Sequence, residues 1–195
     1  MWIKICGITT PAAVDAALAS GVDAIGFVFA ESVRRVTPEF ACELAAPARG
    51  RVRCVAVTRH ATQIDVDAMI AIFAPDVLQA DASDFERIRL PRHLSVLPVV
   101  RAGVAAPVPL PARILFEGPA SGAGMPCDWS AAGKLAHGCE LVLAGGLTAG
   151  NVAAAIEVVQ PFGVDVSSGV EERPGVKSPQ EIARFVEACR RKGKS

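Results

Sequence analysis

The sequence predicts an α/β fold: a single closed (β/α)8 barrel, the TIM barrel, that spans residues 1–195 and has a degenerate fifth helix. Eight short apolar runs, rich in β-branched residues, alternate with segments of helical periodicity. Alternating strands and helices form βαβ units, and eight units without a long insertion suit a closed barrel. The alternative is an open doubly wound sheet. No G-x-G-x-x-G follows the first strand, which weakens the dinucleotide-binding version of that alternative.

The expected elements follow one another in regular order. Strands are expected at 2–6, 24–29, 53–58, 77–80, 96–100, 112–117, 140–144 and 163–167. Helices are expected at 11–20, 38–46, 62–74, 85–93, 129–136, 149–160 and 179–192. Three helices begin with proline directly after Thr or Ser, at Pro11, Pro38 and Pro179, where proline fits the first helical turn.

The fifth crossover breaks this pattern. Between the fifth and sixth strands the chain reads AGVAAPVPLP, with Pro107, Pro109 and Pro111 at alternate positions. Proline removes a backbone donor and clashes with the preceding helical turn, so a regular helix cannot form here. We expect an extended segment packed over the barrel, which helps explain the short chain.

Composition and charge exclude several classes of protein. Twenty basic residues balance twenty acidic ones, so no overall field attracts nucleic acid or an anionic membrane. No apolar run approaches the roughly 18 residues of a membrane helix, and Lys4 in the first strand argues against a signal peptide. The six cysteines lack C-x-x-C pairs and a histidine cluster. We therefore expect no metal site, and free thiols in a reducing, cytoplasmic location.

Cys6 lies where the first strand ends and the chain turns at Gly7. Side chains alternate along a strand, so Ile3 and Ile5 suit the helix-facing side while Lys4 and Cys6 point into the barrel. Chemistry in such barrels collects at the carboxyl ends of the strands, which puts Cys6 at the mouth. Position alone leaves two interpretations open: a reactive thiol, or a buried cysteine that packs as a small apolar side chain.

Lys4 is expected to be an inward-facing cation, which needs a carboxylate partner to stay charged. Asp165 on the eighth strand and Glu117 on the sixth are the candidates. A cation at this place also favours the thiolate form of Cys6. A purely structural pair between Lys4 and Asp165 is an equally good interpretation.

Two loops rich in glycine and serine follow the last two strands, in LAGGLTAGNV and DVSSGVE. Glycines in loops are often only turn residues, but here they let the backbone approach a ligand, and the helix expected near Thr148 offers free N–H groups. Donors that converge from these two loops form a phosphate cradle in a barrel. The residues expected to form it are Gly145, Gly146, Ser167, Ser168 and Gly169.

Two further stretches carry polar candidates. In GPASGAGMPCDWS, Asp128 precedes a helix, where it suits either an N-cap or, behind a flexible glycine loop, a general acid. In SVRRVTP, after the second strand, Arg34 and Arg35 are adjacent, and one could fork onto a substrate carboxylate. Loop arginines are otherwise mostly solvated.

Four stretches, KICGIT, SVRRVTPE, GMPCDWS and LAGGLTAGNV with PFGVDVSSGVE, together resemble the phosphoribosylanthranilate isomerase family of tryptophan biosynthesis. The similarity runs in order and at matching spacing from residue 2 to about residue 190. The resemblance implies an isomerase that converts N-(5-phosphoribosyl)anthranilate, a phosphorylated sugar–anthranilate substrate, to 1-(2-carboxyphenylamino)-1-deoxyribulose 5-phosphate. The reaction implied is an acid/base Amadori rearrangement without metal or organic cofactor.

The resemblance also implies roles for single residues. Cys6 matches the family's general base, Asp128 its general acid, and Arg34 the arginine at the anthranilate end of the substrate. The residues expected to bind substrate are Arg34, Gly145, Gly146, Asp165, Ser167, Ser168 and Gly169.

The chain departs from the family pattern in three places. The fourth strand leads into QADA where QLHG is common, so Gln79 remains but the role of the histidine cannot be transferred. Glu117 stands where an aspartate is usual, and the loop before Asp128 reads GAGMPC in place of a glycine-lysine pattern. The acid, the base and the phosphate loops all remain.

Other functions compete with this one. The nearest rival is another phosphate-binding barrel, such as an aldolase, an epimerase or a flavin-bound oxidoreductase. A barrel that binds sugar phosphates without turnover is a second. A third is a bifunctional isomerase that also serves histidine biosynthesis, which would be expected to have an aspartate in place of Cys6.

Overall fold

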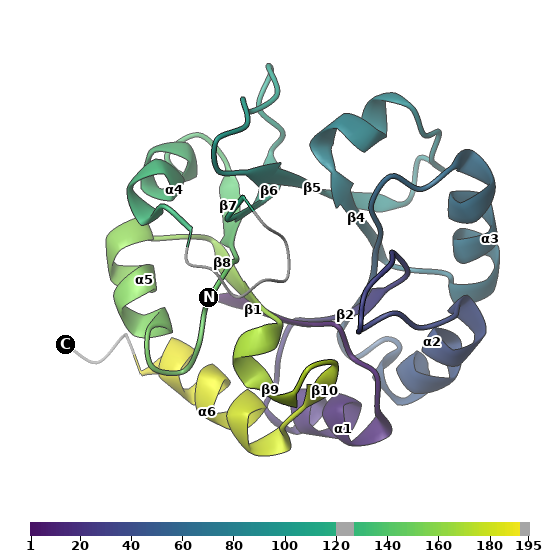
Figure 1. Ribbon diagram of the computed structural model, residues 1–195, viewed down its shortest axis with the longest axis horizontal. Helices are drawn as coiled ribbons and strands as arrows, with labels where there is room; N and C mark the ends of the chain where they lie inside the picture. Colours follow the sequence, from purple (N-terminus) through teal and green to yellow (C-terminus); the bar gives the residue numbers. More distant parts are fainter. Residues whose placement is uncertain (120–126, 192–195) are drawn as a thin grey trace.

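The barrel is closed. A computed structural model describes residues 1–119 and 127–191, and its strands form one parallel ring in chain order, with the last strand paired to the first. Figure 1 looks along this ring. The strands are β1 (Trp2–Cys6), β2 (Ala24–Val28), β3 (Arg53–Val57), β4 (Val77–Asp81), β5 (Ser95–Arg101), β6 (Arg113–Glu117), β7 (Glu140–Leu143) and β8 (Gly163–Val166). The predicted fold class is confirmed, and the open sheet is excluded.

The helices lie around the outside of the ring (Figure 1). They are α1 (Pro11–Ala19), α2 (Pro38–Ala45), α3 (Gln63–Phe73), α4 (Trp129–Ala136), α5 (Val152–Val159) and α6 (Pro179–Arg190). The hydroxyls of Thr10, Thr37 and Ser178 accept backbone N–H groups at the starts of α1, α2 and α6, each just ahead of the predicted proline. These caps satisfy donors that the first helical turn leaves unpaired.

Two crossovers lack an α-helix. Residues 102–112, between β5 and β6, contain no helix, as the alternating prolines predict. The helix predicted over 85–93 is wrong: a short 3₁₀ turn, η2 (Ala82–Glu86), takes its place. Pro91 disfavours helical geometry at the residue before it, so the apolar pattern there is too short to continue as a helix.

A small hairpin that the sequence pattern did not predict joins β8 to α6. The 3₁₀ turn η3 (Ser168–Val170) leads into β9 (Glu171–Arg173), which pairs antiparallel with β10 (Val176–Lys177). A further 3₁₀ turn, η1 (Ala46–Ala48), follows α2. Figure 1 draws the hairpin between α6 and α1. Within it, the carbonyl oxygen of Gly175 accepts the Thr9 hydroxyl, so the hairpin contacts the loop after β1.

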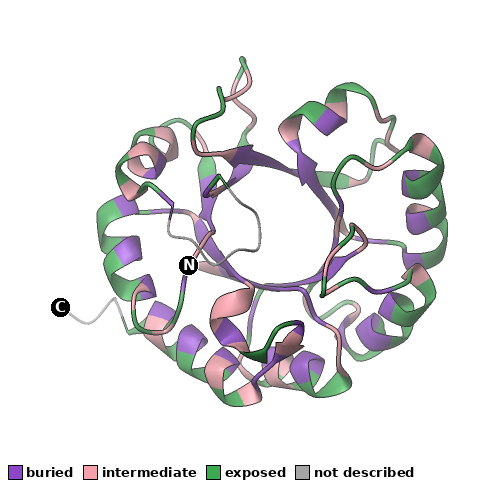
Figure 2. Cartoon of the chain, in the orientation of Figure 1, coloured by how far each residue is buried: buried purple, intermediate pink, exposed green. Residues whose placement is uncertain are grey.

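Apolar side chains fill two layers. Ile3 and Ile5 belong to the outer layer between strands and helices, as predicted. A smaller inner cluster fills the barrel on one side and consists of Leu97, Val99, Leu115, Val142 and Ala144. Figure 2 shows the buried ring and the exposed outer faces of the helices. On the other side of the barrel the inward positions include the buried, charged Lys4 and Asp165.

Candidate active site

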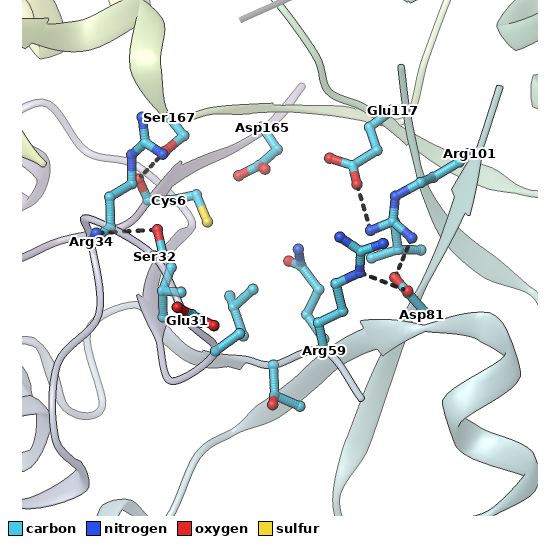
Figure 3. Close-up of a pocket in the computed structure, with 16 residues that line it drawn as sticks. Cys6, Glu31, Ser32, Arg34, Arg59, Asp81, Arg101, Glu117, Asp165 and Ser167 are labelled. Carbon is cyan, nitrogen blue, oxygen red and sulfur yellow. Dashed lines mark hydrogen bonds and ion pairs between the residues drawn. The ribbon is translucent and has the colours of Figure 1, made fainter. Parts of the chain in front are cut away.

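A cavity opens at the carboxyl ends of the strands and is lined by the ends of β1 to β6 and β8 (Figure 3). This is the face at which (β/α)8 barrels carry their chemistry. Its polar lining residues are Cys6, Glu31, Ser32, Arg34, Thr58, Arg59, Gln79, Asp81, Arg101, Glu117, Asp165 and Ser167. Four predicted site residues are therefore brought together here: Cys6, Arg34, Asp165 and Ser167.

The turn after β1 explains why a glycine follows the cysteine. Gly7 has a φ of +76°, and a Cβ atom there would lie 2.6 Å from Cδ of Arg34. Only glycine adopts this conformation without strain and leaves room for the arginine. Cys6 is next to Gly26 of β2, where a Cβ would lie 3.2 Å from Cys6 Sγ and 3.3 Å from Lys4 Nζ. The thiol thus points inward beside the lysine, as predicted.

Lys4 pairs with Asp165, one of its two predicted partners. The two residues face each other in the β1–β8 register, and Lys4 Nζ lies 2.8 Å from Asp165 Oδ1. Lys4 is fully buried. Burial alone would lower the pKa of Lys4, but the charge of Asp165 and its hydrogen bond oppose this, and the net pKa of Lys4 is raised. The lysine is therefore a permanent cation beside the thiol.

Burial decides the state of the Cys6 thiol. Desolvation by burial raises the pKa of Cys6, and the negative charge of Asp165 raises it further. The positive charges of Lys4 and Lys177 lower it. The net result is a pKa of Cys6 above its ordinary value. Lys4 does favour the thiolate, as expected, but it does not outweigh burial. Before substrate binds, the thiol is protonated at neutral pH.

Arg34 is held by a carboxylate that the sequence analysis did not single out. Its Nε lies 2.6 Å from Glu171 Oε1 and its Nη2 lies 3.0 Å from Glu171 Oε2, a bidentate pair. Lys177 Nζ binds the same carboxylate at 2.7 Å. Arg34 therefore lines the cavity in a fixed orientation, with Nη1 as the end that Glu171 does not bind.

The two predicted phosphate loops lie against each other. A Cβ on Gly169 would collide with the carbonyl oxygen of Leu147, so the loop after β8 packs on the loop after β7. Gly145 and Gly146 both have positive φ, at 88° and 65°. The hydroxyl of Ser167 donates to the carbonyl oxygen of Cys6 at 3.0 Å, so its proton is used inside the protein.

The helix after the first of these loops begins later than predicted. α5 starts at Val152, and Asn151 Oδ1 accepts the N–H of Thr148 at 2.8 Å. Asn151 Nδ2 also donates to the carbonyl oxygen of Gly146. The polar side chain of Asn151 thus ends the loop in a tight turn and delays the helix, which corrects the expected start near Thr148.

Asp128 is the N-cap of α4. Its Oδ1 accepts the N–H of Ser130 at 2.9 Å and the N–H of Ala131 at 3.2 Å, and the residue is exposed. It is not among the residues that line the cavity. The predicted glycine loop ahead of it falls largely on 120–126, which lie outside the described residues. The cap is confirmed, and the role as a general acid stays a prediction.

The side of the cavity away from Cys6 is a network of ion pairs. Arg101 at the end of β5 binds Asp81 of β4, and its Nη2 lies 2.9 Å from Glu117 Oε1 of β6. Arg59 lies 3.4 Å from the same aspartate. The carbonyl oxygen of the buried Gln79 side chain has no hydrogen-bond partner within the described residues. This network was not predicted from the sequence, although opposite charges at adjacent strand ends indicate such pairs.

The side chains His60, Asp81 and Asp84 come close enough to hold a cation, as judged within the described residues. Both carboxylates are already bound to arginines: Asp81 to Arg101, and Asp84 to Arg87. The two guanidinium groups oppose a further cation at this place. The group is therefore explained by ion pairs.

The parallel ring with a polar cavity at its carboxyl ends places the chain among the (β/α)8-barrel enzymes. The model of the N-(5'-phosphoribosyl)anthranilate (PRA) isomerase family matches residues 3–188. The chain belongs to this family. Within the described residues, no helix combines the length and apolar character needed to cross a membrane.

Relatives and solved structures agree with this assignment. An N-(5'-phosphoribosyl)anthranilate isomerase of Nitrobacter hamburgensis is 39% identical over 96% of this chain and 92% of its own length. TrpF from Jonesia denitrificans has a TM-score of 0.80 and 39% identity, with 97% of each chain covered. A phosphoribosyl anthranilate isomerase in complex with reduced 1-(o-carboxyphenylamino)-1-deoxyribulose 5-phosphate has a TM-score of 0.76 and 30% identity, over 97% of this chain and 98% of its own.

Proposed function

We infer that this chain catalyses the isomerisation of N-(5-phosphoribosyl)anthranilate to 1-(2-carboxyphenylamino)-1-deoxyribulose 5-phosphate, an aldose–ketose step of tryptophan biosynthesis. The observation that carries the inference is the family match over residues 3–188. It coincides with a thiol at the mouth of the barrel, beside a buried cation.

The proposed reaction needs one acid and one base. Protonated Asp128 donates to the furanose ring oxygen, the C1–O bond breaks, and the nitrogen lone pair forms a C1=N iminium. The iminium acidifies the hydrogen on C2. Its positive charge also favours ionisation of the Cys6 thiol, whose proton passes to solvent, and the resulting thiolate removes the C2 proton. The C2–H electrons form a C1=C2 bond and neutralise the nitrogen, and the resulting enolamine tautomerises to the ketone.

The geometry of Asp128 supports a division of labour between its two oxygens. Both amide hydrogen bonds of the α4 cap go to Oδ1. Oδ2 is then the oxygen proposed to carry the proton.

The substrate is proposed to lie across the mouth, with its phosphate on the loops after β7 and β8. Arg34 uses Nη1 for the anthranilate carboxylate, since Glu171 binds its Nε and Nη2. Asp165 uses Oδ2 for a sugar hydroxyl, since Lys4 binds Oδ1. The proposed phosphate-binding residues are Gly145, Gly146, Ser167, Ser168 and Gly169.

Three properties stay predictions from the sequence. They are the cytoplasmic location, the absence of nucleic-acid and membrane partners, and the single-domain organisation over residues 1–195.

Anthranilate-type substrates are fluorescent, and this fluorescence is lost on conversion. The testing experiment therefore adds purified protein to freshly made N-(5-phosphoribosyl)anthranilate and follows the loss of fluorescence, with the product identified by mass spectrometry. Unchanged fluorescence at micromolar protein would overturn the inference.

A further inference from the structure

The β9–β10 hairpin places two charged side chains against Arg34 and Ser167, which line the cavity. Glu171 is the first residue of β9 and Lys177 the last of β10. Their side chains are 6% and 0% exposed, so both charges are removed from solvent. Removing charges from water is costly unless they are paired, so their partners are informative.

Lys177 is bound to the loop that follows β8. Its Nζ donates to the carbonyl oxygen of Ser167 at 3.0 Å and to the Ser167 hydroxyl at 3.2 Å. That hydroxyl in turn donates to the carbonyl oxygen of Cys6. A continuous chain of hydrogen bonds therefore runs from Lys177 through Ser167 to the backbone of Cys6.

Glu171 links this chain to Arg34. Its Oε1 accepts from both Lys177 Nζ and Arg34 Nε, so one carboxylate stands between two cations. Arg34 packs on Gly7, directly after the cysteine. The arrangement leaves one positive charge in excess on this side of Cys6.

We propose that Lys177 is a positioning residue of the reaction: it fixes Ser167 against the backbone of Cys6 and places a second positive charge beside the thiol. The inference rests on the proposed function, because it takes Cys6 as the base. The proposal adds Lys177 of β10 to a site whose proposed base lies at the end of β1.

Four charged side chains act on Cys6, each from a different part of the fold. They are Lys4 of β1, Asp165 of β8, Lys177 of β10 and Arg34 of the loop after β2. Lys4 is matched one to one by Asp165. Lys177 shares Glu171 with Arg34, so its charge is only partly neutralised. Burial is the largest cause that raises the pKa of Cys6, and Lys4 and Lys177 are the two cations that lower it. Without Lys177, only Lys4 would oppose burial.

The test measures the Cys6 thiol directly, without turnover. The rate of iodoacetamide modification of Cys6 is followed from pH 6 to 10 by peptide mass spectrometry, which separates this cysteine from the other five. The variants are Lys177→Met, which removes the charge, Lys177→Arg, which keeps it, and Lys134→Met on the exposed surface of α4. We expect about tenfold slower modification at pH 7 in Lys177→Met, equivalent to roughly one pH unit. Lys177→Arg and Lys134→Met should stay within about twofold of wild type.

Glu171→Gln supplies a result of opposite sign. It removes the only carboxylate bound to Lys177 among the described residues, so modification of Cys6 should become faster than in wild type. A merely structural role would loosen the rim in both variants and speed modification in both. Equal or faster modification in Lys177→Met overturns the proposal. Should Lys177→Met fail to fold, Lys177→Gln, which removes the charge and keeps an N–H donor for Ser167, takes its place: slower modification of Cys6 supports the proposal, and equal or faster modification overturns it.

The two inferences fail in different ways. If wild-type protein leaves N-(5-phosphoribosyl)anthranilate unchanged, the proposed function is wrong, while the modification rates still report on Lys177. If wild type turns the substrate over and Lys177→Met has an unshifted pH profile of kcat/KM, only the role of Lys177 is wrong.

Discussion

The two sides of the cavity use charge differently (Figure 3). The Cys6 side consists of Cys6, Lys4, Asp165, Arg34, Glu171 and Lys177. The Arg101 side consists of Arg101, Asp81, Glu117, Arg59 and Gln79. On the Cys6 side, these six residues carry one positive charge in excess, and the exposed Glu31 also lines this side of the cavity (Figure 3). On the Arg101 side, arginines and carboxylates balance.

The difference teaches which part of the mouth is prepared for a reaction. Arg101 ties together the ends of three neighbouring strands, β4, β5 and β6, and its ion pairs are largely buried. Such a network fixes shape, because each charge already has a partner. The Cys6 side instead holds a group whose protonation can change, which is the requirement for a base.

The largest effect expected is on turnover, from the Cys6 side. Cys6→Ala removes the proposed base, and kcat should fall about 10³–10⁴-fold. Affinity for the reduced product should change little, because the phosphate and carboxylate contacts remain. Fluorescence kinetics and calorimetry measure the two quantities. Cys42→Ala, at an exposed cysteine, is the control, and near-normal turnover in Cys6→Ala would exclude the assigned role.

The Arg101 side should respond in stability. Arg101→Met removes the largely buried guanidinium that binds both Asp81 and Glu117, while Arg59 stays beside Asp81, so the free energy of unfolding should fall by about 3 kcal/mol. Arg184→Met, which breaks the exposed pair with Glu181, should cost about 0–1 kcal/mol. Urea unfolding measures both. If Arg101→Met reduced kcat as strongly as Cys6→Ala while the fold stayed stable, the division between the two sides would be wrong.

Asp128 tests whether catalysis needs a group beyond both sides. Asp128→Asn keeps an N-cap side chain, so stability should hold while kcat falls about 10²–10³-fold. Asp128→Ala should show the same kinetic loss and, in addition, a loss of about 1 kcal/mol in unfolding free energy, because the cap is gone. If both variants kept the kcat of wild type, Asp128 would be an N-cap of α4 and not a catalytic acid.

The smallest effect expected is a pH dependence of stability. Burial raises the pKa of Cys6 in the folded state, whereas an unfolded thiol ionises near pH ~8.5. The contribution of the neutral Cys6 thiol to the free energy of unfolding is therefore complete below pH ~8.5. It is lost as the pH rises toward the pKa of Cys6 in the folded protein. Wild type should lose about 1 kcal/mol relative to Cys6→Ala between pH 8 and 9.5. Parallel unfolding curves over this range would show that burial does not hold the thiol neutral.

The barrel could be predicted because strand and helix periodicities are local. The Lys4–Asp165 pair could be predicted too, since closing a ring of eight strands makes the first and last neighbours. The helix expected over 85–93 failed because Pro91 overrides the apolar pattern around it. The start of α5 was misplaced because Asn151 competes with the helix for backbone groups.

The hairpin could not be predicted from periodicity. Glu171 and Lys177 lie in a short polar stretch without an apolar repeat, and only the folded chain shows that both are buried. The preformed Glu171 clamp on Arg34 was missed for the same reason: the partners are 137 residues apart. Ion pairs between distant segments depend on tertiary packing.

The hydrogen bond from the Ser167 hydroxyl to the Cys6 carbonyl oxygen lies where β8 pairs with β1 and closes the ring. During synthesis on the ribosome, Lys4 emerges well before Asp165, which follows it by 161 residues. A nascent or truncated chain that stops before β8 would therefore carry an unmatched interior lysine and no ordered thiol. Catalytic turnover therefore indicates that β8 has paired with β1 and the barrel has closed.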